Sequence, residues 1–140
     1  MTDIIKHAKL THSGAMKIID AAMAKAIEMK LPQCITVTDD GGHLLAFVRM
    51  DGAKLQSIES SHRKAKTAVS ARVPTGGVAT EVEMKLAHAT SGQLTNLKAG
   101  LPIIFDGLVI GAIGVGSQTG EEDLEVAKAG LAALEGVKTF

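Results

Sequence analysis

The sequence lacks several residue types from which small functional sites are often built. Tryptophan and tyrosine are absent, phenylalanine occurs three times, and Cys34 is the only cysteine in 140 residues. A single cysteine excludes an intrachain disulfide and a cysteine-rich zinc site. Because Cys34 stands in the apolar run Gln-Cys-Ile-Thr-Val, we expect it to be a small buried side chain and not a reactive thiol.

The chain also lacks an excess of positive or negative charge. The 15 basic and 15 acidic side chains balance, so no strong field attracts nucleic acid or an anionic membrane. No apolar run is long enough to span a bilayer, and the opening segment MTDIIKHAK lacks the apolar core of a signal peptide. The sequence therefore predicts a cytoplasmic protein with no nucleic-acid or membrane partner.

What the chain does contain is aliphatic. Hydrophobic residues make up 46% of it, almost all of them alanine, valine, isoleucine, leucine and methionine. The length predicts one domain, spanning residues 1–140, with a sizeable core. A short chain with this much aliphatic surface is expected to bury some of it against other copies of itself. The composition therefore favours a homo-oligomer.

Helical and alternating patterns follow one another along the chain. Hairpins in place of alternating βαβ units predict an antiparallel sheet with helices packed on it, an α+β fold. The expected elements are a helix over 13–30 capped by Thr11, a hairpin over 34–50 turning at 39–42, a helix over 55–73, a short helix over 80–89 capped by Thr80, a hairpin over 102–117 turning at 106–107, and a helix over 121–136.

The glycine-rich stretch IGAIGVGSQTGEED, residues 110–123, has the appearance of a phosphate loop. Its glycines run as GxxGxG, the reverse of a dinucleotide fingerprint, and they fall within a predicted hairpin. Glu121, Glu122 and Asp123 occupy the helix start where a phosphate would bind, and Thr119 with Glu122 fits a capping box. We therefore expect Gly111 and Gly114 to allow close backbone packing; the alternatives are a β-bulge or a flat wall against a planar ligand.

Three segments together carry a family resemblance. These segments are residues 37–53 (VTDDGGHLLAFVRMDGA), 63–68 (RKAKTA) and 99–130, and their most specific parts are RMDGA and GAIGV. In them the chain resembles the GlcG/HbpS family, which includes the C-terminal domain of PduO-type proteins. The resemblance covers nearly the whole chain in the same order. It implies a profilin-like three-layer α+β domain, an oligomer higher than a dimer, and haem as the cofactor. It also implies a role in haem or iron handling or in redox sensing.

This chain departs from the family pattern in its glycine loop. The family often reads Gly-Val-Ser-Gly where this sequence has Gly114-Val115-Gly116-Ser117. The haem-contacting residues differ among members, with histidine in one branch and a hydroxyl residue in another. The resemblance therefore leaves the axial ligand open.

Three histidines are the candidate haem-iron ligands, because iron and acid–base chemistry both favour imidazole. His12 follows a helix cap and is either exposed or turned toward a subunit groove. His62 shares a helical face with Glu59 and Lys66, which is either a solvated charged face or an imidazole beside basic groups suited to propionates. His88 is, in order of preference, a core histidine, a ligand, or part of an oligomer seam. The wider candidate ligand site comprises Arg49, Asp51, His62, Lys64, Thr67, Gly111 and Gly114.

Arg49 and Asp51 follow an apolar strand. A charge there is costly to bury unless it is paired, so we expect Arg49 to bond Asp51 or a helix terminus. The alternative is that Arg49 clamps a carboxylate of a ligand held between the second helix and the strand. No GxSxG elbow, HExxH pair or Cys–His signature supports hydrolytic chemistry.

Three hypotheses about function result. The first is a haem- or tetrapyrrole-binding oligomer of the GlcG/HbpS type. The second is an enzyme acting on a small carboxylated metabolite, with Arg49 as clamp and His62 or Lys64 as the acid–base group. The third is an oligomeric accessory subunit without a ligand of its own.

Overall fold

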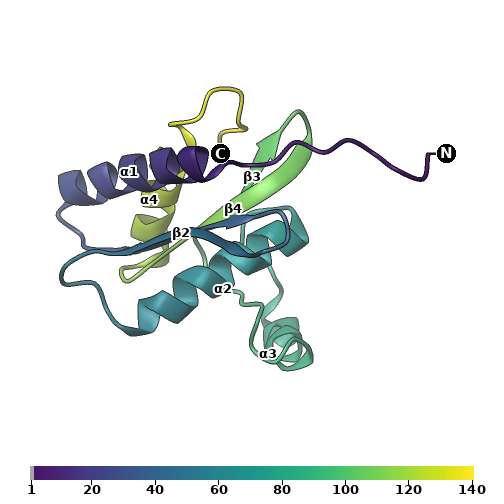
Figure 1. Ribbon diagram of the computed structural model, residues 1–140. Helices are drawn as coiled ribbons and strands as arrows, with labels where there is room; N and C mark the ends of the chain where they lie inside the picture. Colours follow the sequence, from purple (N-terminus) through teal and green to yellow (C-terminus); the bar gives the residue numbers. More distant parts are fainter. Residues whose placement is uncertain (1) are drawn as a thin grey trace.

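A four-stranded antiparallel sheet forms the centre of the molecule, with helices on both faces (Figure 1). The computed structural model describes residues 2–140, and its strand order is β2-β1-β4-β3. The elements are α1 (His12–Met29), β1 (Cys34–Asp39), β2 (Leu44–Arg49), α2 (Gln56–Ala71), α3 (Thr80–Ala89), β3 (Gly100–Phe105), β4 (Leu108–Gly116) and α4 (Gly120–Leu131). The expectation of an α+β fold is confirmed.

The helices divide into two layers. Helices α1 and α4 pack against each other and against one face of the sheet, whereas α2 packs against β4, β3 and β1 from the other face. In Figure 1, α3 lies below α2, farther from the sheet. It contributes no buried residue to the core.

Helix α1 begins and ends as its sequence predicts. The Thr11 hydroxyl accepts a hydrogen bond from the Gly14 N–H at 3.0 Å, which satisfies one free donor of the first turn. The helix ends at Met29, and its C-cap Lys30 takes a left-handed conformation with φ 58°. Between them the side chains at helical spacing form the buried stripe, namely Ala15, Ile18, Ile19, Ala22 and Ala26.

Both hairpins turn where the sequence predicts. In the first, an Asp39 carboxylate oxygen accepts from the N–H groups of Gly41 and His43, at 2.9 and 3.0 Å. In the second, Asp106 and Gly107 both have positive φ, 48° and 75°, which matches the twist of the flanking strands. The strand order then places β1 between β2 and β4.

The start of α3 corrects one expectation. Thr80 is the first helical residue and not the cap, because the N-cap position is Ala79. An alanine side chain cannot accept a hydrogen bond, so no side chain caps this helix.

The glycines of β3 and β4 serve close packing. A Cβ added to Gly114 would lie 2.0 Å from the Ser61 carbonyl oxygen of α2, and one added to Gly111 would lie 2.3 Å from the Thr38 carbonyl oxygen of β1. The space that a planar ligand would need above either glycine is therefore filled by the protein's own backbone. This corrects the alternative in which Gly111 and Gly114 form a wall against a ligand, and it supports the packing interpretation.

Candidate functional site

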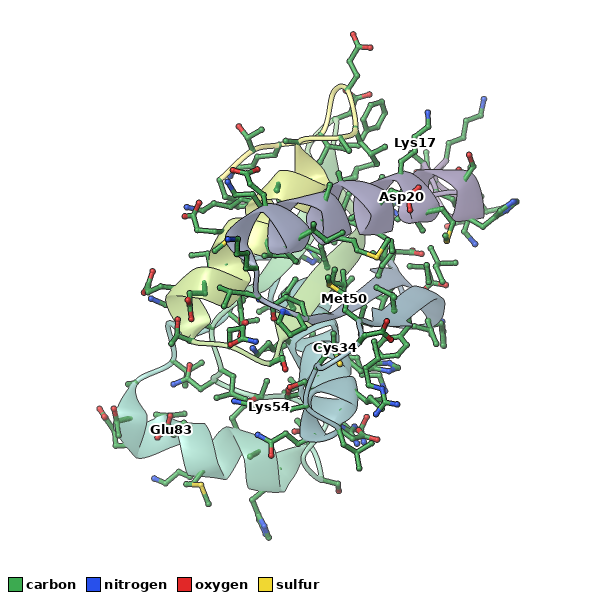
Figure 2. The ribbon with its side chains drawn as sticks, turned by 90° about the vertical axis from the view of Figure 1, so that its left-hand side faces the viewer. Lys17, Asp20, Cys34, Met50, Lys54 and Glu83 are labelled. Carbon is green, nitrogen blue, oxygen red and sulfur yellow. The ribbon has the colours of Figure 1, made fainter. Side chains whose placement is uncertain are left out.

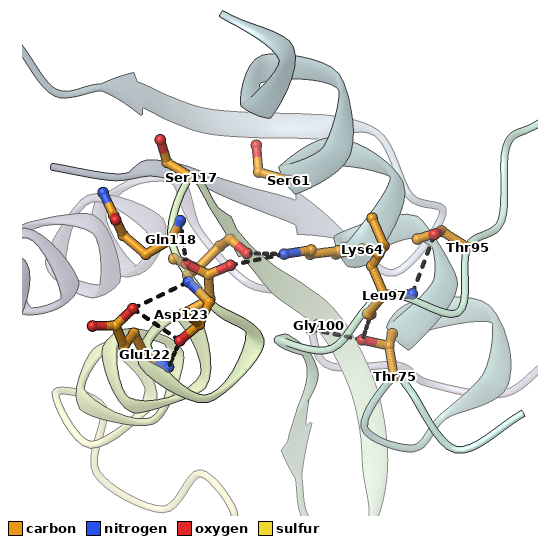
Figure 3. A network of polar contacts seen from close by, with 12 residues as sticks. Ser61, Lys64, Thr75, Thr95, Leu97, Gly100, Ser117, Gln118, Glu122 and Asp123 are labelled. Atoms are coloured by element: carbon orange, nitrogen blue, oxygen red, sulfur yellow. Dashed lines mark hydrogen bonds and ion pairs between the residues drawn. The ribbon is translucent and has the colours of Figure 1, made fainter. Parts of the chain in front are cut away.

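A buried ion pair joins the two helical layers at the end of β4 (Figure 3). The Lys64 ammonium of α2 lies 3.1 Å from an Asp123 carboxylate oxygen of α4, and the two side chains are only 5% and 2% exposed. Lys64 Nζ also donates to the Val115 carbonyl oxygen at 2.7 Å. The other Asp123 oxygen accepts from the Gln118 N–H at 3.0 Å. Such additional hydrogen bonds are what offset the desolvation cost of a buried pair.

The sequence interpretation missed this pair. In the sequence, Asp123 is one of three acidic residues at the start of a helix. The predicted capping box is formed by Thr119 and Glu122 through reciprocal side-chain and backbone bonds, and Asp123 takes no part in it. The sequence did contain an indication of this pair, because each charged residue lies on the buried face of its helix. Lys64 falls in register with buried Ala68 on α2, and Asp123 with buried Val126, Ala127 and Gly130 on α4.

A polar cavity of about 320 Å³ opens beside the ion pair, between the N-terminal ends of α2 and α4. We call it the α2–α4 pocket. Its lining residues are Lys54, Gln56, Ser57, Ser60, Lys64, Leu97, Lys98, Ser117, Gln118, Gly120 and Asp123.

His62 lies in a different polar pocket, of about 250 Å³. Glu59, Arg63, Lys66 and Gln93 complete its lining. Arg63 pairs with Glu59 at 3.2 Å and Lys66 donates to the Gln93 side chain at 2.8 Å. The expected grouping of Glu59, His62 and Lys66 on one helical face is confirmed.

The surroundings of His62 lower the pKa of its imidazole. Burial is the largest cause of its lowered pKa, and the positive charges of Lys66 and Arg63 lower the pKa further. Glu59 and the Gly42 backbone oppose this shift. The Nε2 atom is buried and has no hydrogen-bond partner.

Thr67, the candidate hydroxyl residue on α2, is already engaged. Its hydroxyl donates to the Arg63 carbonyl oxygen at 2.7 Å and accepts from the Thr95 N–H at 2.9 Å. These bonds fix the loop before β3 against α2.

His12 and His88 lie on other helices. His12 is exposed in the first turn of α1. A cavity of about 280 Å³ lies at that end of the sheet, and its lining includes Thr11 and Gly14 but not His12. His88 is exposed on α3, so the expectation of a core histidine is wrong. We call the cavity of about 280 Å³ at the start of α1 the α1 cavity. Its lining residues are Ala8, Lys9, Leu10, Thr11, Gly14, Phe105, Ile110, Leu134, Glu135 and Val137.

The three histidines do not form one site within the chain. His12 belongs to a helix on one face of the sheet and His62 to a helix on the other. Within residues 2–140, no three histidine, cysteine or acidic side chains are grouped so that they could hold a metal ion.

Arg49 and Asp51 are both exposed at the end of β2. Neither takes part in an ion pair with any residue from 2 to 140, so the expected pairing of Arg49 with Asp51 is absent. Arg49 also lines neither the His62 pocket nor the α2–α4 pocket. The clamp and its acid–base partners are therefore not gathered around one cavity.

Cys34 lies on β1, opposite Arg49 of β2, and is buried as expected. Burial raises the pKa of its thiol, and the nearby Arg49 charge opposes that shift. Its Sγ donates a weak bond to the Lys54 carbonyl oxygen at 3.8 Å. Across the described residues, no helix combines the length and apolar character needed to cross a membrane.

Comparison with known proteins agrees with this arrangement. Protein GlcG of Escherichia coli K12 is 40% identical over 107 residues, which cover 76% of this chain and 80% of GlcG. The crystal structure of a PduOC:heme complex covers 94% of this chain and 99% of its own, with a TM-score of 0.87 and 26% identity. The crystal structure of a Streptomyces reticuli HbpS double mutant covers 94% of this chain and 91% of its own, with a TM-score of 0.84 and 32% identity.

The match also extends to a family as a whole. The sequence model of the family described as "Haem degrading protein HbpS-like" matches residues 10–132. That range includes every helix and strand of the described residues, from α1 to α4. The chain belongs to the HbpS-like family.

Proposed function

We propose that the protein binds haem or a related tetrapyrrole and serves in haem or iron handling. The observation that carries the proposal is the likeness, over 94% of the chain, to a PduO domain solved with haem. Membership of the HbpS-like family supports the same ligand. Haem would supply iron with open coordination chemistry, and the chain's own residues would hold and orient it.

His12 and the α1 cavity fit a haem better than the other histidine surroundings do. The cavity offers an apolar wall for a macrocycle, formed by Leu10, Phe105 and Leu134. His12 is not part of the lining, but it follows the lining residue Thr11 in the sequence and is exposed, so its imidazole is accessible to iron. Lys9 adds a positive charge for a propionate.

The other two histidines fit less well. The Nε2 of His62 is buried, so iron would reach it only after the ring turned. Its pocket is lined by charged and amide side chains and lacks an apolar wall. His88 is accessible, but it lies on α3, which contributes nothing to the core.

The proposal includes a homo-oligomer. An open cavity on one protomer covers one side of a planar macrocycle, and a second protomer would cover the other. Large apolar side chains are available for such contacts on the surface, among them Ile4, Ile5 and Ile27, which are 87%, 74% and 63% exposed.

A hemin titration followed by absorbance tests the proposal. We expect wild-type protein to give a saturable Soret band whose position shifts in His12→Ala. The matched variants His62→Ala and His88→Ala should titrate like wild type. A flat wild-type titration would remove the haem proposal, and loss of binding only in His62→Ala would move the ligand to α2. Light scattering on the same samples reports the oligomeric state.

A further inference from the structure

The α2–α4 pocket plays no part in the proposed haem site. It shares no lining residue with the α1 cavity. Apart from Leu97 and Gly120, all of its lining residues have polar or charged side chains, and its most buried charged groups are the Lys64–Asp123 pair. These properties suit a ligand very different from a macrocycle.

Two hydroxyl groups in this pocket lack partners in the protein. Ser57 is only 2% exposed and lines the pocket, yet its hydroxyl forms none of the hydrogen bonds found among residues 2–140. The Ser60 hydroxyl, one helical turn later, is also without a partner in that range. Neither hydroxyl oxygen is among the fully buried unpaired atoms of residues 2–140, so both remain accessible from the pocket and are free to bond polar atoms that enter it.

The charges of the pocket leave donors in excess. Asp123 is satisfied by Lys64 and the Gln118 N–H. Lys98 pairs with Glu121, outside the lining. Lys54 is exposed at the rim and forms no ion pair within residues 2–140. An ammonium group has three donors, and Lys64 uses two of them on protein acceptors.

The backbone around the pocket is consistent with this excess of donors. The N-cap of α2 is Leu55, so no side chain caps that helix beside Gln56 and Ser57, and Glu59 is the acidic residue of its first turn. Ser117 is held at φ 122°, a costly conformation for a residue with a side chain. Its hydroxyl accepts from the Lys54 N–H at 2.8 Å, which fixes the rim.

We propose that the α2–α4 pocket binds a small organic anion through its carboxylate or phosphate group. The Lys54 ammonium and the Ser57 and Ser60 hydroxyls bind the oxyanion. Lys64, at the base, contributes its remaining donor. A cavity of about 320 Å³ admits a molecule of metabolite size.

A titration observed in ¹H–¹⁵N correlation spectra tests this site. Succinate and inorganic phosphate are the probes, at constant ionic strength, with potassium chloride as the blank. We expect saturable shifts in residues 54–60 and 117–120 for at least one probe. Lys54→Ala and Ser57→Ala should each weaken that binding about tenfold, since each removes a hydrogen bond to a charged group.

The controls separate this site from the fold and from haem. Lys17→Ala changes an exposed lysine on α1, away from Lys54 (Figure 2), and should bind like wild type. Ser57→Ala should leave the unfolding free energy and the hemin titration unchanged. Shifts no larger than those of chloride for both probes would overturn the proposal, as would undiminished binding in both Lys54→Ala and Ser57→Ala.

Discussion

The two faces of the sheet carry different types of residue. Toward α1 and α4, the strands present branched aliphatic side chains such as Ile35, Val37 and Ile113, which are fully buried. Toward α2, they present small and polar residues. Gly100 and Gly114 admit the α2 backbone, and the Thr36 hydroxyl lies 2.8 Å from that of Ser61.

This difference determines how each face responds to change. An aliphatic core can adjust to the loss of a methyl group, because neighbouring side chains partly close the space. Backbone in contact with backbone cannot adjust in this way. The α2 face therefore holds Lys64, Ser57 and Ser60 in fixed positions at the pocket, while the α1 and α4 face supplies most of the apolar burial.

Breaking the buried ion pair should have the largest effect. Lys64→Met leaves the Asp123 carboxylate buried without its charge partner, and we expect the free energy of unfolding to fall by about 3–5 kcal/mol. Urea denaturation measures this. The double variant Lys64→Met/Asp123→Leu should recover most of the loss, and a single variant as stable as wild type would show that the pair is not desolvated.

Filling the close contact of the α2 face comes next. Gly114→Ala places a Cβ 2.0 Å from the Ser61 oxygen, so we expect a loss of about 3 kcal/mol from forced separation of α2 and β4. Gly77→Ala is the matched control, because nothing lies within 4 Å of its Cβ position. Equal stability of the two variants would refute the packing account of these glycines.

Removing a methyl group from the aliphatic face should cost less. Ile113 lies on the same strand as Gly114 but faces the other layer, and Ile113→Val should lower the free energy of unfolding by about 1 kcal/mol. The same denaturation series checks this value. A loss larger than that of Gly114→Ala would reverse the comparison between the two faces.

Acidification should have the smallest effect on the α2 face. Because the pKa of His62 is lowered in the folded state, the unfolded chain takes up this proton first as the pH falls below about 6.5. The His62 contribution to stability is therefore lost as the pH falls from that value through the lowered pKa. In unfolding curves recorded across that range, His62→Gln should lose less stability than wild type. Parallel curves would contradict this assignment.

The elements that could be predicted from the sequence are those encoded locally. Thr11, the turn at Asp106-Gly107 and the Thr119–Glu122 capping box each act within a few residues. The exception is α3, where Thr80 has the side chain of a cap but is itself the first helical residue, and Ala79 occupies the N-cap position.

The site was harder to predict because its parts are distant in sequence. Lys64 and Asp123 meet only because α2 and α4 reach the same end of β4 from opposite faces. Burial of the His62 Nε2 likewise depends on how α2 packs. The candidate histidines could be named from the sequence, but their separation onto different faces required the fold.

The central claim is that haem occupies the α1 cavity beside His12, and paramagnetic broadening by ferric hemin tests it most directly. Amide signals are recorded from ¹⁵N-labelled protein with and without hemin. The account predicts that signals of residues 10–14, 105 and 134 broaden while those of the α2–α4 pocket, residues 54–60, persist. Broadening centred on His62 or His88, or no broadening at all, would contradict it.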